Sequence, residues 1–512
     1  MRILGISCMF HDASVSVVED GEILFAAHAE RYSKFKNDPF LNKEMIEEAL
    51  TFGKPDVIIL HEKDWAKRLR NIVAGNWSAL KEPSAKKWIK DFYPQLAGIP
   101  IKSYWHHETH AAAGALTSPF EDAAVMVIDA IGEFNTATIW EFKYHGQRKE
   151  DRYLEKLHTV NFPSSLGLFY SAVTAFVGLK PMEDEYILMG MAAYGDRAKA
   201  LNIVEEMKTK YFAIHDPNDD LAHCLDTVVN LQRGIPKGDL EGHDQFDIAL
   251  AAQIIAEERI TAYAKYAKFL TNSKNLVFMG GVALNCVANP GLFKLFENIH
   301  IMPNPGDAGS SLGAAAMEWF EQTGQKVNWR VPYLGHEIVG KYPVEKAMES
   351  LRKNEIFGIA NGRAEYGPRA LGNRSLMADP RGGDIKDRMN EIKHRQKFRP
   401  FAPVILAEYA DEYFEMPKPG IQSPYMQFVA KCKFPDEFPA IIHADGTSRV
   451  QTVTQEDNPG LYELLSRFND ELGCPMLVNT SLNIKGQPIV DDEHDAAAFQ
   501  KHYGVTVHTK DD

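Results

Sequence analysis

Short apolar runs that end in polar or glycine-containing loops recur along the chain, and this alternation restricts it to an α/β fold. Residues 3–7, 14–18 and 23–27 are rich in β-formers, and the Glu-Asp-Gly-Glu stretch between the last two has the composition of a hairpin turn. Further runs have the length of buried strands, at residues 55–61, 122–129, 275–279 and 299–302. Helical patterns lie between them, so we expect sheets covered by helices.

The length and the charge of the chain narrow its class further. With 512 residues, it exceeds what one hydrophobic core usually supports, so two or three domains are expected. A formal charge of −14 at pH 7 argues against nonspecific coating of nucleic acids. The five cysteines are scattered without a CxxC pair, which indicates reduced thiols. The N-terminus enters a strand pattern directly, and no window reaches the ~20 apolar residues of a membrane span. We therefore expect a cytoplasmic protein with no membrane partner.

Three histidines and a glutamate fall within five positions at His106–His110. They precede an alanine-rich run at residues 111–116, which predicts a helix. On one helix, His106 and His110 stand one turn apart on the same face, the spacing with which two imidazoles bind one metal ion. His107 would point elsewhere. The alternative is a polar helix start whose histidines are solvated or bonded to the backbone.

Two loops repeat one layout, in which a strand ends in a polar loop and a second strand returns. The first loop carries His11 and Asp12, and the second, after the strand at residues 122–128, carries Asp129 and Gly132. The order of strands and loops at the N-terminus is how the actin-like ATPase fold opens, with its first loop facing nucleotide phosphates. The second loop suits another phosphate or metal-ion site. Its alternative is a hairpin with a polar tip.

Glycine marks the end of a later strand. Gly280 and Gly281 follow the run at residues 275–279 and precede a helix-forming stretch that includes Asn285. Bare backbone at this junction lets a purine or a phosphate approach closely, with a helix N-terminus behind it.

A second set of small residues opens a helix after residue 302, with Asp307 at its start and Gly309 two residues later. An acid in this place could complete a metal site with His106 and His110, giving two histidines and one carboxylate with open positions for substrate. The alternative for Asp307 is an N-cap, which is a common and sufficient role.

Beyond a polar, proline-containing connection at residues 322–342, the chain becomes rich in glycine and arginine. The segments 362–375 and 390–403 contain many cations, among them Arg369, Lys393 and Arg399. Guanidinium groups bind phosphate bidentately and lysine acts as a point charge, so a small and highly anionic ligand is expected. The alternative is a solvated basic face, but the interleaved glycine, proline and phenylalanine indicate rigid turns. Two later segments suit the same site: residues 443–453, with Arg449, and residues 478–483, with Asn479 and Ser481.

Taken in order, these elements resemble the NodU/CmcH family of ATP-dependent O-carbamoyltransferases. The matching segments are His11–Ser14, Ala29–Tyr32 with Lys36, His106–Ala112, Gly280–Asn285, Gly306–Asp307, Gly367–Ser375, Phe398–Pro403 and Val478–Ser481. They extend over nearly the whole chain.

The resemblance implies two domains and a division of labour between them. An N-terminal domain of actin-like ATPase (ASKHA) fold, related to the tRNA threonylcarbamoyl-transferase domain, is expected over residues 1–335, and a YrdC-like α/β domain over residues 336–512. In such enzymes the C-terminal domain joins carbamoyl phosphate to ATP, giving carbamoyl adenylate. The N-terminal domain then passes the carbamoyl group to an acceptor hydroxyl beside a metal ion.

The resemblance also implies roles for single residues. The carbamoyl phosphate site is expected at Arg369, Lys393, Arg399, Arg449, Asn479 and Ser481. The metal, for which Fe²⁺ is the family expectation, is expected at His106, His110 and Asp307. The nucleotide loops, for ATP with Mg²⁺ as co-substrate, are expected at Asp129, Gly132, Gly280, Gly281, Asn285 and Gly309. Lys36, His11 and Asp12 are expected on the acceptor side, with His11 or Asp12 as the base.

The residues do not select the acceptor. We expect a small molecule, a sugar or a hydroxymethylated nucleotide or DNA base, and a homodimer is a possible assembly. Ile187 stands where relatives usually carry lysine, which removes a charge near the nucleotide or the acceptor. Two other functions compete. Threonylcarbamoyl transfer to tRNA fits poorly with the arginine-rich site and the net charge, and a non-catalytic ATP-binding protein would not need the cations after residue 360.

Overall fold

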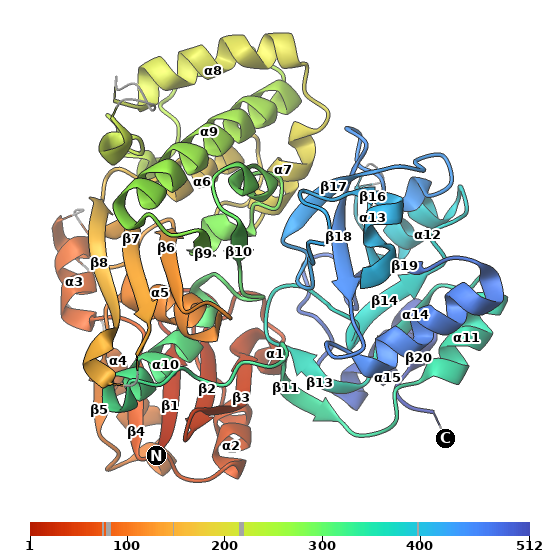
Figure 1. Ribbon diagram of the computed structural model, residues 1–512, viewed down its shortest axis with the longest axis horizontal. Helices are drawn as coiled ribbons and strands as arrows, with labels where there is room; N and C mark the ends of the chain where they lie inside the picture. Colours follow the sequence, from red (N-terminus) through yellow and green to blue (C-terminus); the bar gives the residue numbers. More distant parts are fainter. Residues whose placement is uncertain (74–75, 78–82, 147, 214–219, 397–398, 512) are drawn as a thin grey trace. The chain divides into compact units, whose positions relative to one another are not determined.

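The computed structural model describes residues 1–512 except 74–75, 78–82, 147, 214–219, 397–398 and 512. The chain divides into two compact units (Figure 1). Unit 1 consists of Met1–Ala26 and Pro39–Trp329, and unit 2 consists of Ala27–Asp38 and Arg330–Asp512. A short stretch near the N-terminus therefore belongs to the unit that is otherwise C-terminal. Both units are α/β, as the sequence predicts.

Unit 1 contains two five-stranded sheets that follow the same plan. The first has the order β3 (Glu22–His28), β2 (Ser14–Glu19), β1 (Arg2–Ser7), β4 (Val57–Leu60) and β5 (Ile101–Ser103). The second has the order β8 (Arg152–Asn161), β7 (Asn135–Tyr144), β6 (Asp122–Ile128), β9 (Asn275–Met279) and β10 (Asn298–His300). In each, the central strand pairs antiparallel with the strand that follows it and parallel with a later one. This doubled layout is that of the actin-like ATPase fold, although the sequence shows no repeat.

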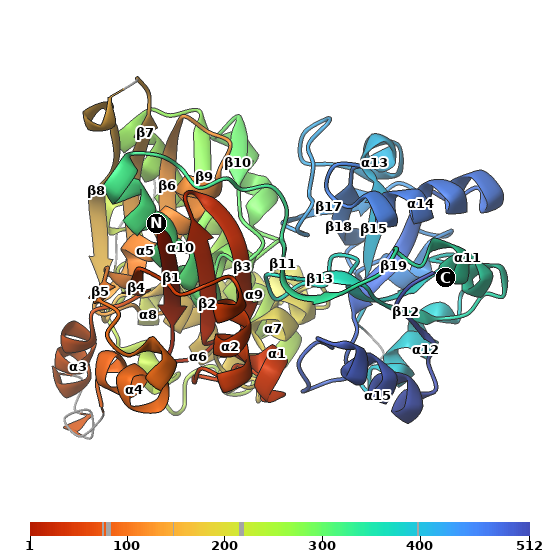
Figure 2. The same cartoon turned by 90° about the horizontal axis from the view of Figure 1, so that it is seen from below.

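Nine helices of the described part of unit 1 accompany these sheets. They are α2 (Lys43–Thr51), α3 (Asp64–Val73), α4 (Ala85–Phe92), α5 (His106–Thr117), α6 (Leu166–Phe176), α7 (Glu185–Ala192), α8 (Arg197–Tyr211), α9 (Gln245–Thr271) and α10 (Ser310–Thr323). In both views α5 and α10 lie between the two sheets, α10 against β1 and α5 against β6 (Figures 1 and 2).

Glycine allows this close packing at two points. A Cβ atom on Gly313 of α10 would lie 1.8 Å from the carbonyl oxygen of Thr109 in α5. A Cβ atom on Gly5 of β1 would lie 1.9 Å from the carbonyl oxygen of Ser311. Because no side chain fits there, the backbones of α5, α10 and β1 are held in one arrangement.

One expected helix is shorter than predicted. The stretch after Gly280 forms only a 3-10 turn, η6 (Gly281–Leu284), followed by a second one, η7 (Asn289–Lys294), instead of an α-helix. Proline at position 290 stands at the start of the second turn, where it lacks the N–H that a continuing helix would use. Gly280 itself has a φ of 86°, which favours glycine.

Unit 2 is built on a mixed sheet of eight strands. Its order is β16 (Phe414–Glu415), β17 (Phe428–Cys432), β18 (Thr447–Val453), β15 (Ala402–Leu406), β19 (Met476–Ser481), β14 (Arg374–Ala378), β12 (Phe357–Ala360) and β20 (Val507–His508). A separate pair consists of β11 (Tyr333–Ile338) and β13 (Gly362–Glu365). The helices are α1 (Ala29–Ser33), α11 (Val344–Arg352), α12 (Ile385–Ile392), α13 (Ala410–Tyr413), α14 (Pro459–Leu472) and α15 (Glu493–Tyr503). Helices α11 and α14 pack together, and α14 contacts β15 and β19.

Candidate metal centre and cation cluster

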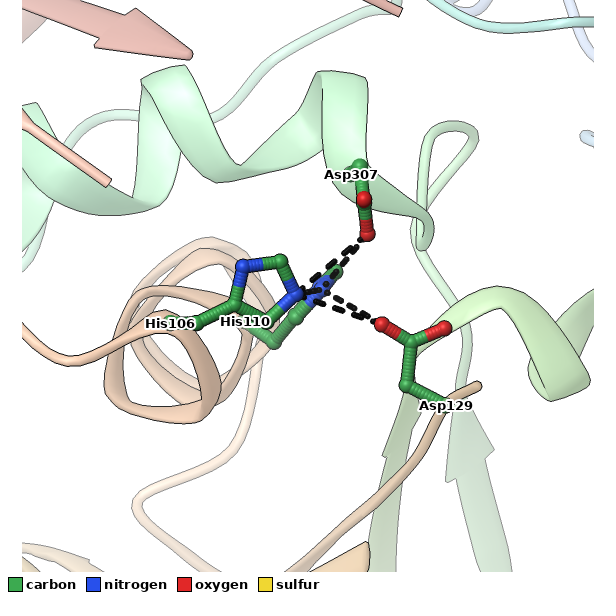
Figure 3. A group of neighbouring side chains, drawn as sticks. All are labelled: His106, His110, Asp129 and Asp307. Carbon is green, nitrogen blue, oxygen red and sulfur yellow. Dashed lines mark hydrogen bonds and ion pairs between the residues drawn. The ribbon is translucent and has the colours of Figure 1, made fainter. Parts of the chain in front are cut away.

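Four buried side chains of unit 1 point toward one another at the start of α5 (Figure 3). His106 and His110 come from the first turns of α5, and their Nε2 atoms lie 3.1 Å apart. The carboxylate of Asp129, at the end of β6, lies 3.2 Å from His106 Nε2 and 3.5 Å from His110 Nε2. The carboxylate of Asp307 lies 3.4 Å and 3.3 Å from the same two atoms.

These distances fit the coordination of one cation. Ligand atoms bound about 2.0–2.2 Å from an ion, at angles of roughly 90–110°, are separated by about 2.9–3.5 Å. The four atoms lie within 4.8 Å of one another, and two ring nitrogens so close together repel unless a proton or a cation lies between them. The Nδ1 atoms of His106 and His110 are buried without a partner among the described residues, so the hydrogen-bonding capacity of both rings is directed through Nε2. Two histidines and two carboxylates suit a divalent transition metal.

Asp307 lies at the start of a helical segment, as expected, but it does not cap the helix. The segment begins with a 3-10 turn, η8 (Asp307–Gly309), whose N-cap is Gly306 and in which no side chain accepts a capping hydrogen bond. The Asp307 carboxylate instead faces the two histidines. The alternative role for Asp307, an N-cap, is therefore not what the structure shows.

The electrostatics of the group follow from burial and opposite charge. Burial by itself lowers the pKa of His106, but Asp307 and Asp129 outweigh it, and the pKa is raised well above its usual value. Burial and Asp307 raise the pKa of Asp129, yet hydrogen bonds with His106 and His110 leave it below its usual value. Burial also raises the pKa of Asp307, but His11 and His106 leave it well below its usual value, so both carboxylates are held ionised, which is the state that binds a cation.

Partners around the four side chains fix their orientation. The backbone N–H of Gly281 donates to Oδ1 of Asp129 over 3.2 Å, so the other oxygen of that carboxylate is free to face the histidines. Glu133 accepts from the backbone N–H of His106. A Cβ atom on Gly132 would come within 3.1 Å of the His106 ring. Such partners keep ligands in place at metal sites.

His11 and Asp12 lie beside this group. His11 Nε2 is 3.4 Å from Oδ2 of Asp307, and its Nδ1 is 2.9 Å from the Asp12 carboxylate. Burial lowers the pKa of His11, but Asp307 and Asp12 raise it to about 9. Asp12 has a φ of 54°, so the loop holds a strained backbone where this pair forms. A quarter of the His11 side chain is exposed, in contrast with the four buried residues.

His107 is directed away from the group. Its Nδ1 lies 3.1 Å from the hydroxyl of Thr138 on β7, and burial, followed by the charge of His106, lowers its pKa well below the usual value. It is a buried histidine with a hydrogen-bond partner, and it points elsewhere than His106 and His110, as the helical spacing predicts.

Each of the residues expected to bind nucleotide has its own packing or hydrogen-bond partners. Gly280 packs on β6, where a Cβ atom would lie 2.2 Å from the carbonyl oxygen of Ile128. Asn285 exchanges hydrogen bonds with Gln253 of α9 over 3.0 and 3.1 Å. Gly309 packs against the backbone of Asn304, because a Cβ atom on Gly309 would lie 1.9 Å from the carbonyl oxygen of Asn304. Asp129 is part of the four-residue group, next to Gly281.

A second group of polar and charged side chains lies in unit 2, around Lys393 at the C-terminal end of α12. Its ammonium group is buried and donates to the hydroxyl of Ser481 over 3.1 Å, to Asn483 Oδ1 over 2.7 Å and to the backbone oxygen of Ser481. Burial lowers its pKa well below the usual value, and Arg395 and Arg399 lower it further. The described hydrogen-bond acceptors of this ammonium group carry no charge.

Other cations extend this site, which we call the cation cluster: Lys386, Lys393, Arg395, Arg399 and Arg449. Burial lowers the pKa of Lys386, Asp387 opposes that, and the charge of Arg395 lowers it further. Burial lowers the pKa of His443 to about 4; Asp445 opposes this, and the charges of Arg449 and Lys386 lower the pKa further. Positive groups so close together favour an anion between them.

The turn that carries Arg369 is joined to the same sheet. Asn479 Nδ2 donates to the backbone oxygen of Ala370 over 3.0 Å, and Gln451 Nε2 donates to that of Leu371 over 3.0 Å. Asn479 and Ser481 are two residues apart on β19, so they project from the same face of the sheet. Asn479 thus holds the Arg369 turn, and Ser481 holds Lys393.

One arginine of this segment has a structural role instead. Arg374 is fully buried, and its guanidinium donates to the backbone oxygens of Asn361, Gly362, Asn373, His336 and Asp491. Its hydrogen-bonding capacity is used within the fold. Phe398, in the expected Phe-Arg-Pro segment, lies outside the described residues.

Lys36 belongs to unit 2, whereas the family resemblance implies a role for it on the acceptor side. Its positive charge contributes to the lowered pKa of Lys393, after burial, Arg395 and Arg399. The chain reaches this place because Ala27–Asp38 belong to unit 2.

Two family models match the chain. Residues 60–316 match "Carbamoyltransferase N-terminus", and residues 348–509 match "Carbamoyltransferase C-terminus". The chain belongs to the carbamoyltransferase family. The resemblance found from the sequence motifs is thereby confirmed.

Relatives of this carbamoyltransferase cover most of its length. The nodulation protein NolO of Bradyrhizobium diazoefficiens is 33% identical, over 76% of this chain and 75% of that protein. The 3'-hydroxymethylcephem-O-carbamoyltransferase of Amycolatopsis lactamdurans is 27% identical, over 97% of this chain and 96% of that one. Among solved structures, the HypF protein of T. kodakarensis aligns with 63% of this chain and 48% of its own, at 15% identity and a TM-score of 0.35.

Sequence reasoning missed some functional neighbours in this carbamoyltransferase. The sequence shows Asp129 as an acid at the end of a strand, but it does not show that the carboxylate faces His106 and His110. Glu133 and Gln451 had no signal beyond a polar residue in a turn or a strand. None of the described helices is long and apolar enough to cross a membrane.

Proposed function

We propose that this carbamoyltransferase works through two half-reactions, as an ATP-dependent O-carbamoyltransferase. In unit 2, carbamoyl phosphate and ATP give carbamoyl adenylate. In unit 1, the carbamoyl group passes to an acceptor hydroxyl, and AMP leaves. The transfer to the acceptor takes place at the metal group, which consists of His106, His110, Asp129 and Asp307.

The observation that carries the proposal is Lys393. A buried ammonium group is costly unless an opposite charge is near, and its described acceptors are neutral while its described neighbours are cations. A doubly charged phosphate would neutralise this excess of positive charge. Arginine forks bind its oxygens bidentately, and Lys393 adds a point charge. Two phosphate-bearing reactants need such neutralisation to approach each other.

The first half-reaction balances with one water molecule. Water cleaves the bond between the carbamoyl group and phosphate, releasing inorganic phosphate and carbamate. A carbamate oxygen then attacks the α-phosphorus of ATP and expels pyrophosphate. In the second half-reaction the acceptor oxygen attacks the carbamoyl carbon, AMP leaves, and the hydroxyl proton goes to a base.

His11 is the base that unit 1 offers for this proton once a cation held by the four residues offsets the charge of Asp307, which raises the pKa of His11 while the site holds no cation. Its Nε2 faces the metal group, and its Nδ1 is held by Asp12, the arrangement that orients an imidazole for proton transfer. A divalent cation held by the four residues would supply Lewis acidity toward a carbonyl or hydroxyl oxygen. Fe²⁺ is the ion that the family resemblance implies, and imidazole and carboxylate ligands suit it as they suit other divalent transition metals.

The acceptor is proposed to be an alcohol. The relative from Amycolatopsis lactamdurans is named for O-carbamoylation of a hydroxymethyl group. We therefore infer a primary hydroxyl on a small molecule, a sugar or a modified nucleotide.

The two half-reactions can be separated by experiment. The purified protein is incubated with ATP and carbamoyl phosphate, and inorganic phosphate, pyrophosphate and AMP are measured with and without panels of hydroxyl compounds. Arg369→Ala should abolish pyrophosphate release that depends on carbamoyl phosphate. His106→Ala should keep it and lose transfer to the acceptor.

Two results would overturn the proposal. Formation of ADP instead of AMP and pyrophosphate would exclude the adenylate. Equal failure of both variants in pyrophosphate release would show that the two sites are not assigned to separate half-reactions. Lys501→Ala, on an exposed part of α15, is the matched control for the loss of a cation in unit 2.

A further inference from the structure

Helix α3 contacts two loops that surround the metal group, and it has no role in the proposed function. The ammonium group of Lys67 donates to the backbone oxygen of Met9, in the loop after β1, over 3.1 Å. The buried guanidinium of Arg70 donates to the backbone oxygen of Gly132, in the loop after β6. The first of these loops carries the proposed base and the second a carboxylate of the metal group, so α3 is fixed against the site.

The order of the first sheet places α3 at the same edge as the metal group. Strand β4 runs parallel to β1 and to β5, and Leu60 at its end lies opposite Ile6 on one side and Ser103 on the other. The segments that leave these three strands lead to His11, to α3 and to His106. Ligands of open α/β sheets bind at the carboxyl ends of parallel strands, so a substrate is expected at this edge.

Two tryptophans are exposed on these segments. Trp65, in the first turn of α3, is 62% exposed, and Trp105, which directly precedes His106, is 40% exposed. Their rings meet edge-on, with centroids 5.8 Å apart. We call these two residues the tryptophan pair. Leu69 lies one turn after Trp65 on the same face of α3 and is also exposed. Large apolar side chains that are exposed together mark a binding surface.

A third aromatic residue lies beside the proposed base. The ring of Phe10 is exposed, and its centroid lies 4.5 Å from that of His11. The ammonium group of Lys67 lies 5.4 Å from the centroid of the Phe10 ring, which joins this loop to α3. His11 is itself partly exposed and contacts Asp307 with its Nε2 atom. The exposed side of the metal group is therefore flanked by an aromatic ring.

The charges of this segment favour a neutral ligand. Lys67 pairs with the buried carboxylate of Glu62 over 2.6 Å. Lys63 donates through its ammonium group to the backbone oxygen of Ser103, and Arg70 donates to the loop after β6. These three cations are engaged within the fold, so a phosphate group would have to replace existing hydrogen bonds. The exposed aromatic rings need no charge on the ligand.

We propose that the tryptophan pair and Phe10 form the acceptor subsite, which takes a neutral alcohol with a flat ring. The ring packs on Trp65 and Trp105, and its primary hydroxyl reaches the metal group beside His11. Indole offers a large, rigid surface on which the face of a sugar ring or of a nucleobase can pack. The hydroxyl oxygen bonds to the carbamoyl carbon as AMP leaves, and its proton goes to His11. This use of the bound alcohol rests on the proposed function.

Binding can be measured without turnover, by saturation-transfer NMR titration of the metal-loaded, full-length protein. The probes are methyl glucopyranoside, the nucleoside hydroxymethyldeoxyuridine, its monophosphate, and the open-chain alcohol sorbitol. We expect one of the two neutral ring compounds to bind about tenfold or more tightly than sorbitol. The ring compound that binds more tightly identifies the ring as a sugar or as a nucleobase.

Substitution of Trp65 tests the contact itself. Trp65→Ala should weaken binding of that ring compound about tenfold or more, as the loss of a stacked aromatic ring does. Trp65→Phe keeps an aromatic ring and should lose less. Phe269→Ala, which removes an aromatic ring that is 76% exposed on α9, is the matched control and should bind like wild type. Equal affinities of Trp65→Ala and wild type would overturn the proposal.

Three further results would also overturn it. Absence of binding by either neutral ring compound would remove the subsite, and sorbitol bound as tightly as they are would remove the need for a ring. Tighter binding of the monophosphate than of the nucleoside would show that the subsite selects an anion.

Trp105→Ala needs a second measurement, because its neighbour is a metal ligand. We expect the same weakening of ring binding together with full metal content by elemental analysis. Loss of metal would show that Trp105 holds the start of α5, and would overturn its place in the subsite.

Turnover separates this proposal from the proposed function. Trp65→Ala should raise the KM for the ring-bearing acceptor about tenfold or more, and kcat should fall much less, because the lost contact binds substrate and transition state alike. If wild type releases no pyrophosphate with carbamoyl phosphate and ATP, the proposed function fails. Ring binding that depends on Trp65 would then still support the subsite.

Discussion

Both carboxylate oxygens of Glu133 lie 3.1 Å from the backbone nitrogen of His106, the residue with which α5 begins. The first N–H groups of a helix have no partner within it, and they attract a negative charge. Glu133 also accepts from the backbone N–H of Lys63 over 2.8 Å. A carboxylate at this point therefore fixes where α5 starts, and with it the first histidine of the metal group.

Replacing Glu133 should weaken metal binding although it touches no metal. Loss of a partner that holds a ligand costs about 10–100-fold in metal affinity, so we expect such a loss in Glu133→Ala. Glu133→Gln keeps an acceptor oxygen and should lose less. Competition with a chelator measures the affinity. Glu47→Ala, at an exposed position of α2, is the control, and equal affinities of Glu133→Ala and wild type would contradict the role.

The histidines at positions 107 and 110 should behave differently when replaced. His110→Ala removes a nitrogen that faces both carboxylates, so bound metal, measured by elemental analysis, should fall to background. His107→Gln keeps a polar group near Thr138 and should retain metal at the wild-type level. Full occupancy in His110→Ala would mean that these histidines are only a buried polar network. Asp129→Asn should resemble His110→Ala, because its carboxylate lies in the same group.

The sequence predicts much of the fold because its signals are local. The strands at residues 3–7, 14–18 and 122–128 lie where apolar runs and turn residues place them, and α5 follows from alanine content. The histidine spacing depends only on helical periodicity, so the structure brings His106 and His110 to one face. Asp307 joins them because the turn that it begins, and the helix α10 that follows, pack against α5.

What escaped the sequence depends on tertiary structure. Asp129 follows a strand, which is also where a residue of a nucleotide-binding loop is expected. Its carboxylate faces the histidines only because β6 packs beside α5. Arg374 and Arg369 cannot be told apart in a segment rich in arginine, yet the guanidinium of Arg374 donates its hydrogen bonds to backbone oxygens of the fold. The path of residues Ala27–Asp38 into unit 2 leaves no mark on local periodicity, so the sequence did not show to which unit Lys36 belongs.

Gly313→Ala should destabilise unit 1, because the added methyl group would lie 1.8 Å from the carbonyl oxygen of Thr109. Helices α10 and α5 would have to separate, at a cost of about 2–4 kcal/mol in the free energy of unfolding. Since Thr109 lies between the two histidines of the metal group, metal affinity should fall as well. Denaturant unfolding with and without metal measures both effects.

Gly291→Ala is the matched control for that substitution. A Cβ atom there meets nothing within 4 Å, so its free energy of unfolding should change by less than about 1 kcal/mol. A Gly313→Ala protein as stable as Gly291→Ala would show that α5 and α10 can shift apart freely.

Lys393 should make anion binding dependent on pH. Burial and the neighbouring arginines lower its pKa in the folded protein, so the unfolded chain binds more protons between that pKa and the ordinary lysine value of about 10.4. The free energy of unfolding should therefore rise with pH across this window, and Lys393→Met should remove that part of the rise. A bound phosphate favours the charged ammonium, so binding above the lowered pKa should take up a proton. Calorimetric titration with phosphate at pH 8, in buffers of different ionisation enthalpy, measures the uptake. Proton uptake by Lys393→Met equal to that of wild type would assign the titration to another group of the cluster.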